Sequence, residues 1–263
     1  IDGSIMETLE WATNWVKDNG YNGLVISSDS THFSAGANLN LILNLAIRKD
    51  WDGIDRLSKS MQDVLQGLRF APFPVIAAPF GMVLGGGYET IGACDKIVSS
   101  AELYCGLVEV GVGLIPGGGG NLRMIMNFAD KFANAQAGPF PISMKSFEAI
   151  GFAKVSSSAK EAQAIGYLTK KDKIVINRDF ILSESKSEIL KMAVNYKAPI
   201  YREDLILPGL DGRLVMESSI NDFRKAGKIS AHDGHIATKL SKVLTGGDKG
   251  GLFSPVDEQY LLD

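Results

Sequence analysis

Cysteine and histidine are both scarce in this sequence. Its 263 residues include two cysteines, Cys94 and Cys105, which lie in apolar or helical contexts without the spacing of metal ligands. We therefore expect reduced core residues and neither a disulfide framework nor a zinc site. Of the three histidines, His232 and His235 are close enough to share one helix face, but no further ligand cluster accompanies them. No bound metal is predicted.

Excess charge of one sign and long apolar runs are also missing. The formal net charge is -3, so nothing favours a nucleic acid or an anionic membrane surface as a partner. No apolar run approaches the roughly 18 residues of a membrane span, and no signal peptide is evident. We expect a cytoplasmic protein. Because the chain opens with Ile1 and ends inside an apparent helix, it is also expected to be a piece of a longer protein.

Two common nucleotide-binding patterns are absent. The glycines at 117–120 suggest a phosphate loop, but Asn121-Leu-Arg123 follows them in place of Gly-Lys-Ser/Thr. No Gly-x-Gly-x-x-Gly follows a predicted strand, so the sequence offers no dinucleotide site. A nucleoside triphosphatase is therefore rejected, and a nicotinamide cofactor is not expected to bind this part of the chain.

The most informative stretch runs from Pro74 to Arg123. An apolar run at 74–78 predicts a short buried strand, and residues 90–95 predict the first turns of a helix. Between them stand Gly85, Gly86 and Gly87, which allow the backbone to approach a ligand closely, while the free N–H groups of a helix start attract negative charge. This junction predicts an oxyanion site, beside which two carboxylates would suit acid/base chemistry on a carbonyl compound.

Those two carboxylates also have simpler explanations. Glu89, in the first turn of the predicted helix, could merely stabilise the helix dipole, by about 0.3–1 kcal/mol. Glu109 alternates with Val108 and Val110, so it could lie on the solvent face of a strand. Taken alone, each glutamate is better explained in this simpler way; catalytic roles for both follow only from the family resemblance described below.

The first part of the chain predicts a helix at 4–18, a buried strand at 23–28 and two helices over 39–70 with a core-facing apolar stripe. Between strand and helices, small residues at 34–37 again allow a ligand to contact backbone, although an ordinary tight turn is equally compatible. His32 borders this segment and could contact the ligand or only cap the turn. The later part predicts a loop at 135–141, helix within 148–166, a strand at 173–176, a helix at 183–196, an extended linker at 197–209 and helices at 214–225 and 235–244.

Four motifs, taken in order and spacing, resemble the crotonase, or enoyl-CoA hydratase/isomerase, superfamily. They are Phe33-Ser-Ala-Gly-Ala-Asn-Leu39, Pro74-Val-Ile-Ala-Ala78, Gly85-Gly-Gly-Tyr-Glu89 with Cys94-Asp95, and Val108-Glu109 through Leu114-Ile-Pro-Gly-Gly-Gly-Gly120. The resemblance implies an α/β fold, a crotonase-type core of repeated strand-strand-helix units followed by a helical C-terminal region. We place the catalytic core at 1–130 and the C-terminal region at 131–263. Segments at 201–208, 232–235 and 246–247 resemble the hydratase region of a long bacterial 3-hydroxyacyl-CoA dehydrogenase of fatty-acid oxidation.

The resemblance also implies roles for individual residues. Ala37 and Gly86 match the two backbone N–H donors of the family's oxyanion hole, and Glu89 and Glu109 match its catalytic glutamates. Five further residues are expected to line the substrate: Ser34, Ala35, Gly36, Gly85 and Gly87. Asn38 stands where the family usually has aspartate, and its amide can make similar local hydrogen bonds in a turn.

The implied reaction is the hydration of a trans-2-enoyl-CoA to a 3-hydroxyacyl-CoA. Double-bond isomerisation and an acyl-CoA-binding scaffold without turnover are the alternatives; a serine peptidase of related fold is disfavoured because Ser34 lacks a nucleophile elbow. The chain would need no cofactor of its own, because coenzyme A arrives as part of the substrate and NAD is expected only in the missing portion. The expected partners are the acyl-CoA and the dehydrogenase portion of the same longer chain, and a homo-oligomer is left open.

Overall fold

A computed structural model describes residues 1–133 and 138–263 of the chain, which form two compact units. Unit 1 comprises residues 1–105 and 156–200, and unit 2 comprises residues 106–155 and 201–263. These units do not coincide with the predicted stretches 1–130 and 131–263, and that division into a catalytic core and a C-terminal region stays a prediction.

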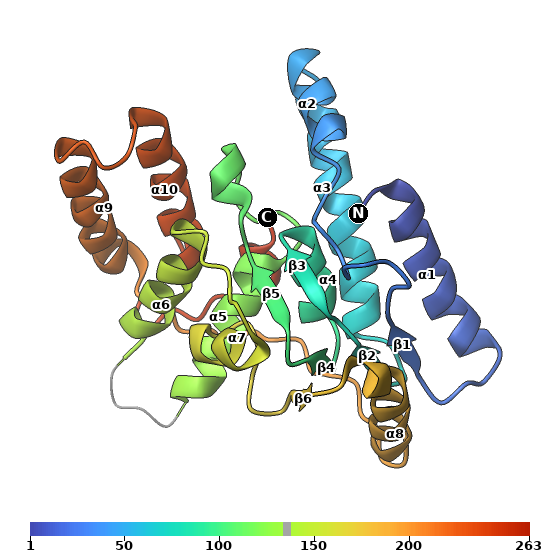
Figure 1. Ribbon diagram of the computed structural model, residues 1–263. Coiled ribbons are helices and arrows are strands. Elements are labelled where there is room, and N and C mark those ends of the chain that lie inside the picture. Colours follow the sequence, from blue (N-terminus) through green and yellow to red (C-terminus); the bar gives the residue numbers. More distant parts are fainter. Residues whose placement is uncertain (134–137) are drawn as a thin grey trace. The chain divides into compact units, whose positions relative to one another are not determined.

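The elements of both units are labelled in Figure 1. Unit 1 contains, in chain order, α1 (Gly3–Asp18), β1 (Leu24–Ile26), α2 (Leu39–Ile47), α3 (Trp51–Arg69), β2 (Val75–Ala77), β3 (Gly81–Leu84), α4 (Gly86–Gly92), β4 (Lys96–Ser100), most of β5 (Leu103–Gly106), α7 (Ala159–Ile165), β6 (Lys173–Val175), η2 (Arg178–Phe180) and α8 (Ile181–Ala193). Unit 2 contains η1 (Glu109–Val112), α5 (Gly120–Phe132), α6 (Phe140–Gly151), α9 (Gly209–Lys225), α10 (Ala231–Leu244) and η3 (Gln259–Leu261).

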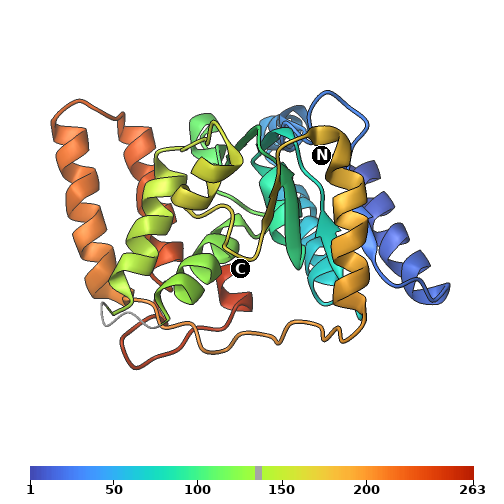
Figure 2. The same ribbon diagram turned by 60° about the horizontal axis from the view of Figure 1, so that its bottom comes forward.

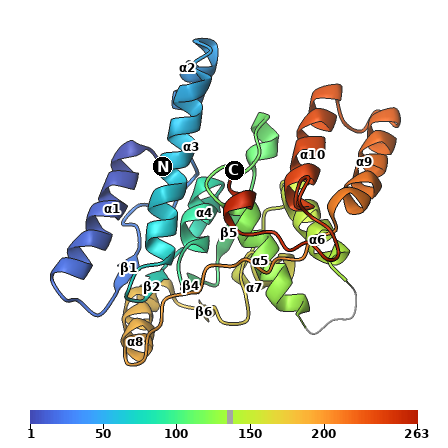
Figure 3. The same cartoon turned by 180° about the vertical axis from the view of Figure 1, so that it is seen from behind.

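A parallel sheet with the strand order β1-β2-β4-β6 forms the centre of unit 1. In β1 and β2, successive residues point to opposite faces, as the twofold period of a strand requires. Leu24 and Val75 therefore join a core cluster with α1 and α3, whereas Val25 and Ile76 join a second cluster with α8. Figure 3 shows α1 and α3 side by side, and Figure 2 shows α8, in gold, along the strands. Helices thus cover both faces, as expected for parallel strands that are apolar on both sides.

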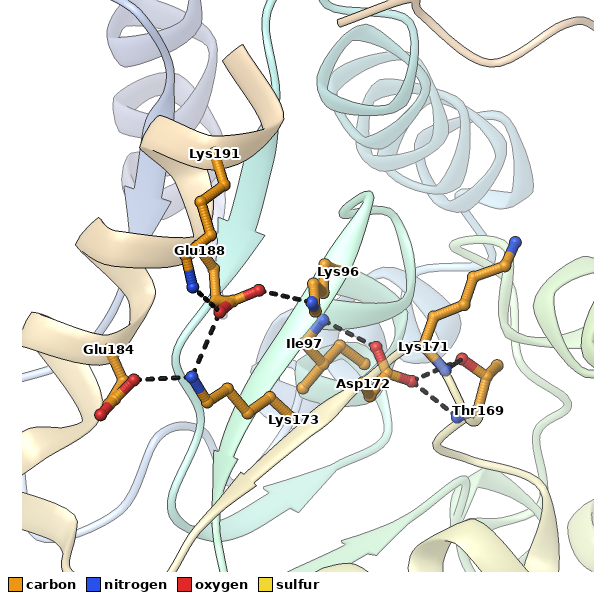
Figure 4. A network of polar contacts seen from close by, with 9 residues as sticks. All are labelled: Lys96, Ile97, Thr169, Lys171, Asp172, Lys173, Glu184, Glu188 and Lys191. Carbon is orange, nitrogen blue, oxygen red and sulfur yellow. Dashed lines mark hydrogen bonds and ion pairs between the residues drawn. The ribbon is translucent and has the colours of Figure 1, made fainter. Parts of the chain in front are cut away.

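A network of charged side chains joins β4, β6 and α8 (Figure 4). Glu188 of α8 accepts hydrogen bonds from Lys96 at 2.7 Å, Lys173 at 3.2 Å and Lys191 at 3.0 Å, and Lys173 also pairs with Glu184 at 2.6 Å. The hydrogen bond from Lys96, followed by that from Lys191, lowers the pKa of Glu188 to about 2. The network therefore ties the starts of two neighbouring strands to one helix.

Beside this network, Asp172 joins the turn before β6 to β4. Its carboxylate accepts the Ile97 N–H at 2.8 Å and the Thr169 N–H at 2.6 Å. Burial nevertheless raises the pKa of Asp172, because desolvation outweighs the stabilising hydrogen bonds. The partly buried carboxylate therefore joins two segments that are far apart in the sequence.

The expected core-facing stripe over residues 39–70 is confirmed for α3 and wrong for α2. In α3, Leu65 and Leu68 are buried in the first core cluster. In α2 no residue is buried, and Ile47 is 70% exposed. The physical reason is that α2 packs mainly along α3, which covers only one side of a helix that is apolar nearly all round.

Unit 2 is mainly helical. The hydroxyl of Ser143, on α6, donates to the carbonyl of Leu244 at the end of α10, at 2.7 Å. Gly209 has φ +62 and lies so close to Gly250 that a Cβ would meet the Gly250 carbonyl oxygen at 2.0 Å, so only glycine fits this crossing. The loop predicted at 135–141 lies partly outside the described residues. Among the described residues, no helix has both the length and the apolar character needed to cross a membrane.

Candidate active site

The loop after β1 and the loop after β3 bring Ala37 and Gly86 together within unit 1. A Cβ placed on Gly86 would lie 3.6 Å from the Ala37 backbone nitrogen. Gly85, before it, has φ +52, a left-handed conformation that favours glycine. Gly86 is the first residue of α4, so its N–H has no partner within the helix. Gly86 and the backbone nitrogen of Ala37, which are far apart in the sequence, therefore lie close together.

A short parallel pairing between residue 34 and β3 holds the two loops together. The Ser34 N–H donates to the Met82 carbonyl and the Leu84 N–H donates to the Ser34 carbonyl, both at 3.0 Å. Ser34 also forms a parallel bridge with Val83. Ala37 follows this pairing on one strand and Gly86 follows it on the other, so the register of the pairing sets the spacing of the two N–H groups.

The remaining residues expected to contact substrate gather around this pairing. The Ser34 hydroxyl accepts the Gly36 N–H at 3.1 Å. Gly87 lies against Ser34, because a Cβ on Gly87 would be 2.8 Å from the Ser34 Cβ. Gly36 has φ +103 and lies close to β3, whereas Ala35 is exposed. The glycines therefore serve close packing between loop and helix as well as any contact with a ligand.

Asn38 ends this segment as the N-cap of α2. Its side-chain oxygen accepts the Asn40 N–H at 3.2 Å. Aspartate and asparagine are equally good at this position because both present an oxygen to the free N–H groups. The difference from the family pattern is therefore compatible with the same local structure.

Glu89 lies in the first turn of α4 and is 4% exposed. On the preceding residue, the Tyr88 ring is fully buried, packs against Tyr167 at 4.9 Å between ring centroids and donates its hydroxyl to the Tyr167 carbonyl at 3.3 Å. The Thr90 hydroxyl donates to the Gly86 carbonyl at 2.9 Å. A carboxylate so deeply placed is unusual for a residue that only stabilises the helix dipole.

Glu109 belongs to unit 2 and begins the short helix η1. The alternative of a solvent-facing strand residue is wrong, because β5 ends at Gly106 and the chain turns into a 3-10 helix. The Leu114 N–H donates to the Glu109 carbonyl at 3.1 Å, and Gly113 ends the turn with φ +82. The Glu109 side chain is partly buried.

The histidines fall in two places. The Nδ1 atom of His32 accepts the Met82 N–H at 3.3 Å, which supports the role of a turn cap. His232 and His235 lie on α10 in unit 2. Among the described residues, no group of three or more potential metal ligands is assembled.

Asp95 stands in one of the four motifs, but no role for its side chain could be predicted from the sequence. Its carboxylate accepts the Val75 N–H at 2.8 Å and the Tyr196 hydroxyl at 3.0 Å, while its own N–H donates to the Val75 carbonyl. Burial, and then the adjacent carboxylate, raises the pKa of Tyr196. Asp95 thus joins the end of α4 to the start of β2, and only the tertiary fold brings Tyr196 to it.

Comparison with known proteins identifies the family of this chain. The family described as Enoyl-CoA hydratase/isomerase matches residues 2–137. The chain is 37% identical over 246 residues to a Bacillus subtilis protein named "Probable 3-hydroxyacyl-CoA dehydrogenase", covering 94% of this chain and 30% of that protein. It is 38% identical over 109 residues to the fatty acid oxidation complex subunit alpha of Vibrio campbellii, covering 40% of this chain and 15% of the subunit. The chain therefore spans less than a third of the length of these relatives.

Solved structures of similar fold include an enoyl-CoA hydratase from Bacillus anthracis and one from Polaromonas. The first has a TM-score of 0.59 and 19% identity, with 93% of this chain and 81% of the other covered. The second has a TM-score of 0.58 and 19% identity, with 90% and 79% covered. These likenesses confirm the predicted α/β crotonase-type fold. The match over residues 2–137, more than half of the chain, shows that the chain belongs to the enoyl-CoA hydratase/isomerase family.

Proposed function

We propose that this chain is the enoyl-CoA hydratase module of a multifunctional fatty-acid β-oxidation protein that also contains a 3-hydroxyacyl-CoA dehydrogenase portion. The observation that supports it most is the adjacency of the Ala37 and Gly86 peptide groups, with Glu89 buried in the same first turn as Gly86. The names of the relatives support the assignment to fatty-acid oxidation and to a longer protein.

In this proposal the Ala37 and Gly86 N–H groups donate to the thioester oxygen of a trans-2-enoyl-CoA. Addition of water oxygen at C3 turns the thioester into an enolate, whose negative charge gathers on that oxygen. A fixed donor at such an oxygen is worth about 2.7–4 kcal/mol of barrier, because it needs no reorganisation as the charge develops. The oxyanion hole therefore acts on the step that forms the enolate.

Proton transfer is assigned to Glu89 and Glu109. One carboxylate takes a proton from the water as its oxygen bonds to C3, and the other, protonated, delivers a proton to C2. The pairing of Glu109 with Glu89 rests on the family motif, and both glutamates favour hydration over isomerisation, which commonly needs one carboxylate in this family. No cofactor is required in this chain, and NAD would serve only the dehydrogenase portion.

The test is the loss of enoyl-thioester absorbance when the purified protein meets crotonyl-CoA. We expect turnover by the wild type and a fall of at least ~10²-fold in kcat for Glu89→Gln and for Glu109→Gln, in line with positioned acid/base catalysis. Glu10→Gln, an exposed residue on α1, makes the same change of charge as a matched control and should leave the rate unchanged. Binding of the thioester without turnover would instead favour an acyl-CoA-binding scaffold.

A further inference from the structure

His32 lies at the start of the backbone pairing that carries the two oxyanion donors. We propose that His32 is a positioning residue, which reinforces the register of residues 33–37 against β3 and thereby the separation of the Ala37 and Gly86 N–H groups. The inference rests on the proposed function, because it gives His32 a part in the same oxyanion hole. In the proposed reaction the His32 side chain does not contact the reacting atoms.

The first support is the sequence of hydrogen bonds along β3. The Phe33 N–H donates to the Phe80 carbonyl at 3.1 Å, and the Ser34 N–H donates to the Met82 carbonyl at 3.0 Å. The N–H of the same residue, Met82, donates to His32 Nδ1 at 3.3 Å. The imidazole thus supplies the acceptor that a backbone carbonyl would supply in a regular ladder, and it extends the pairing by one hydrogen bond.

The second support is the space kept for the imidazole ring. Gly81, the first residue of β3, has φ +60, and a Cβ there would lie 2.6 Å from His32 Nδ1 and 3.4 Å from the Thr31 carbonyl oxygen. The strand therefore begins with a residue that has no side chain at the point where the ring approaches. Both the left-handed backbone and the contact favour glycine at this position.

The turn that leads into His32 is held independently of the imidazole. The Ser28 hydroxyl donates to the His32 carbonyl at 3.3 Å, and the Arg178 guanidinium donates to the Ser30 carbonyl at 3.2 Å. Arg178 also stacks on the Phe80 ring, at 3.5 Å from the ring centroid. Loss of the imidazole should therefore leave the turn in place and remove mainly the hydrogen bond that His32 adds to the three backbone hydrogen bonds of the pairing.

This arrangement has a consequence for catalysis rather than for folding. Oxyanion donors act only when they lie about 2.7–3.1 Å from the developing charge. A displacement of the order of 1 Å can cost about 10²-fold in rate. A shift of residues 33–37 along β3 would move the Ala37 N–H away from that of Gly86 without exposing the core.

The experiment compares His32→Asn with His32→Ala. The asparagine side-chain oxygen occupies nearly the position of Nδ1 and can accept the Met82 N–H, whereas alanine cannot. We expect His32→Ala to lower kcat with crotonyl-CoA by about 10-fold or more, the size of one lost hydrogen bond or greater, with KM within about twofold. His32→Asn should keep at least half of the wild-type kcat, on the order of what a retained acceptor preserves.

A second readout separates positioning from a general loss of stability. Bound butyryl-CoA, a saturated thioester that cannot be hydrated, should show a lowered carbonyl stretching frequency on the wild type and on His32→Asn, and a smaller lowering on His32→Ala. The inference is overturned if His32→Ala keeps the wild-type rate and frequency, or if the two variants are equally impaired. Absence of turnover by the wild type would instead refute the proposed function, and the frequency would still report whether His32 affects the bound carbonyl.

Discussion

Replacement of Gly86 by alanine tests the oxyanion hole with little disturbance of the fold. The added methyl group would lie 3.6 Å from the Ala37 nitrogen, 3.2 Å from the terminal carbon of Met61 and 3.6 Å from the Cδ1 atom of Ile1. The contacts with Ala37 and Ile1 are ordinary van der Waals contacts, and the contact with Met61 meets the flexible end of a side chain that can move. The Gly86 backbone does not have a positive φ, so alanine is tolerated there.

The same methyl group would, however, crowd the space that the thioester oxygen must enter. An oxygen that accepts from Ala37 lies about 3 Å from its nitrogen, and a methyl group 3.6 Å from that nitrogen competes for the same region. We therefore expect Gly86→Ala to lower kcat by about 10²–10³-fold, the effect of losing one oxyanion donor. The free energy of unfolding should change by less than about 1 kcal/mol, since a glycine-to-alanine change at a compatible site is mildly stabilising.

Two further variants calibrate the result. Gly67→Ala, on α3, adds a methyl group that would meet no atom within 4 Å, and it should leave kcat unchanged. Gly87→Ala would press on Ser34 at 2.8 Å and should destabilise the protein by about 1–3 kcal/mol, the usual cost of overpacking. Steady-state kinetics with crotonyl-CoA and thermal unfolding measure both quantities. Wild-type kcat in a stable Gly86→Ala variant would refute the placement of the oxyanion at Gly86.

Three other predictions concern the stability of unit 1. The pKa of Glu188, lowered to about 2 from the usual 4.5 mainly by Lys96, means that the network stabilises the fold above pH ~4.5 and loses that contribution as the pH falls towards ~2. This contribution to the free energy of unfolding is at most about 3 kcal/mol, and solvent screening at the partly exposed lysines reduces it to about 1–2 kcal/mol. Glu188→Gln should flatten the dependence of the free energy of unfolding on pH in this window, and an unchanged slope would contradict the prediction. The Ser185 hydroxyl is buried on α8 without a hydrogen-bond partner among the described residues. Ser185→Ala should therefore raise the free energy of unfolding by about 1 kcal/mol in denaturant titrations. A lower free energy of unfolding would show that the hydroxyl makes a stabilising hydrogen bond. Tyr196→Phe removes the hydroxyl that donates a hydrogen bond to Asp95. The free energy of unfolding should fall by about 1–3 kcal/mol, as for other hydrogen bonds to a charged group. No change in the denaturant midpoint would show that this hydrogen bond does not stabilise the fold.

Local sequence patterns predicted most helices and strands, because these elements depend mainly on residues that are close together in the sequence. The helix expected at 4–18 is α1, and the strand expected at 74–78 is β2, since apolar periodicity and flanking prolines and glycines mark both. The exposure of α2 could not be foreseen, because its apolar residues resemble a core-facing helix until the lack of a covering element is known. Glu109 was ambiguous for a related reason, since a single turn of 3-10 helix and a short strand share the same sequence pattern.

The candidate site was predictable where glycine marks it and unpredictable where distant side chains meet. Gly85 needs a positive φ, and Gly87 must lie close to Ser34, so both positions are visible as glycines in the sequence. The hydrogen bond from Met82 to His32 spans 50 residues and has no signature in sequence spacing. Such contacts follow from the pairing of two loops, which only the tertiary structure defines.

The most direct test of the central claim is the fate of water oxygen during the reaction. The purified protein would be incubated with crotonyl-CoA in water enriched in heavy oxygen, and the thioester products would be examined by mass spectrometry. Hydration predicts a 3-hydroxyacyl-CoA that carries the label in its hydroxyl group, formed by the wild type and much more slowly by Glu89→Gln and Glu109→Gln. An unchanged enoyl thioester, or a product whose double bond has moved without taking up the label, would contradict the assignment as a hydratase.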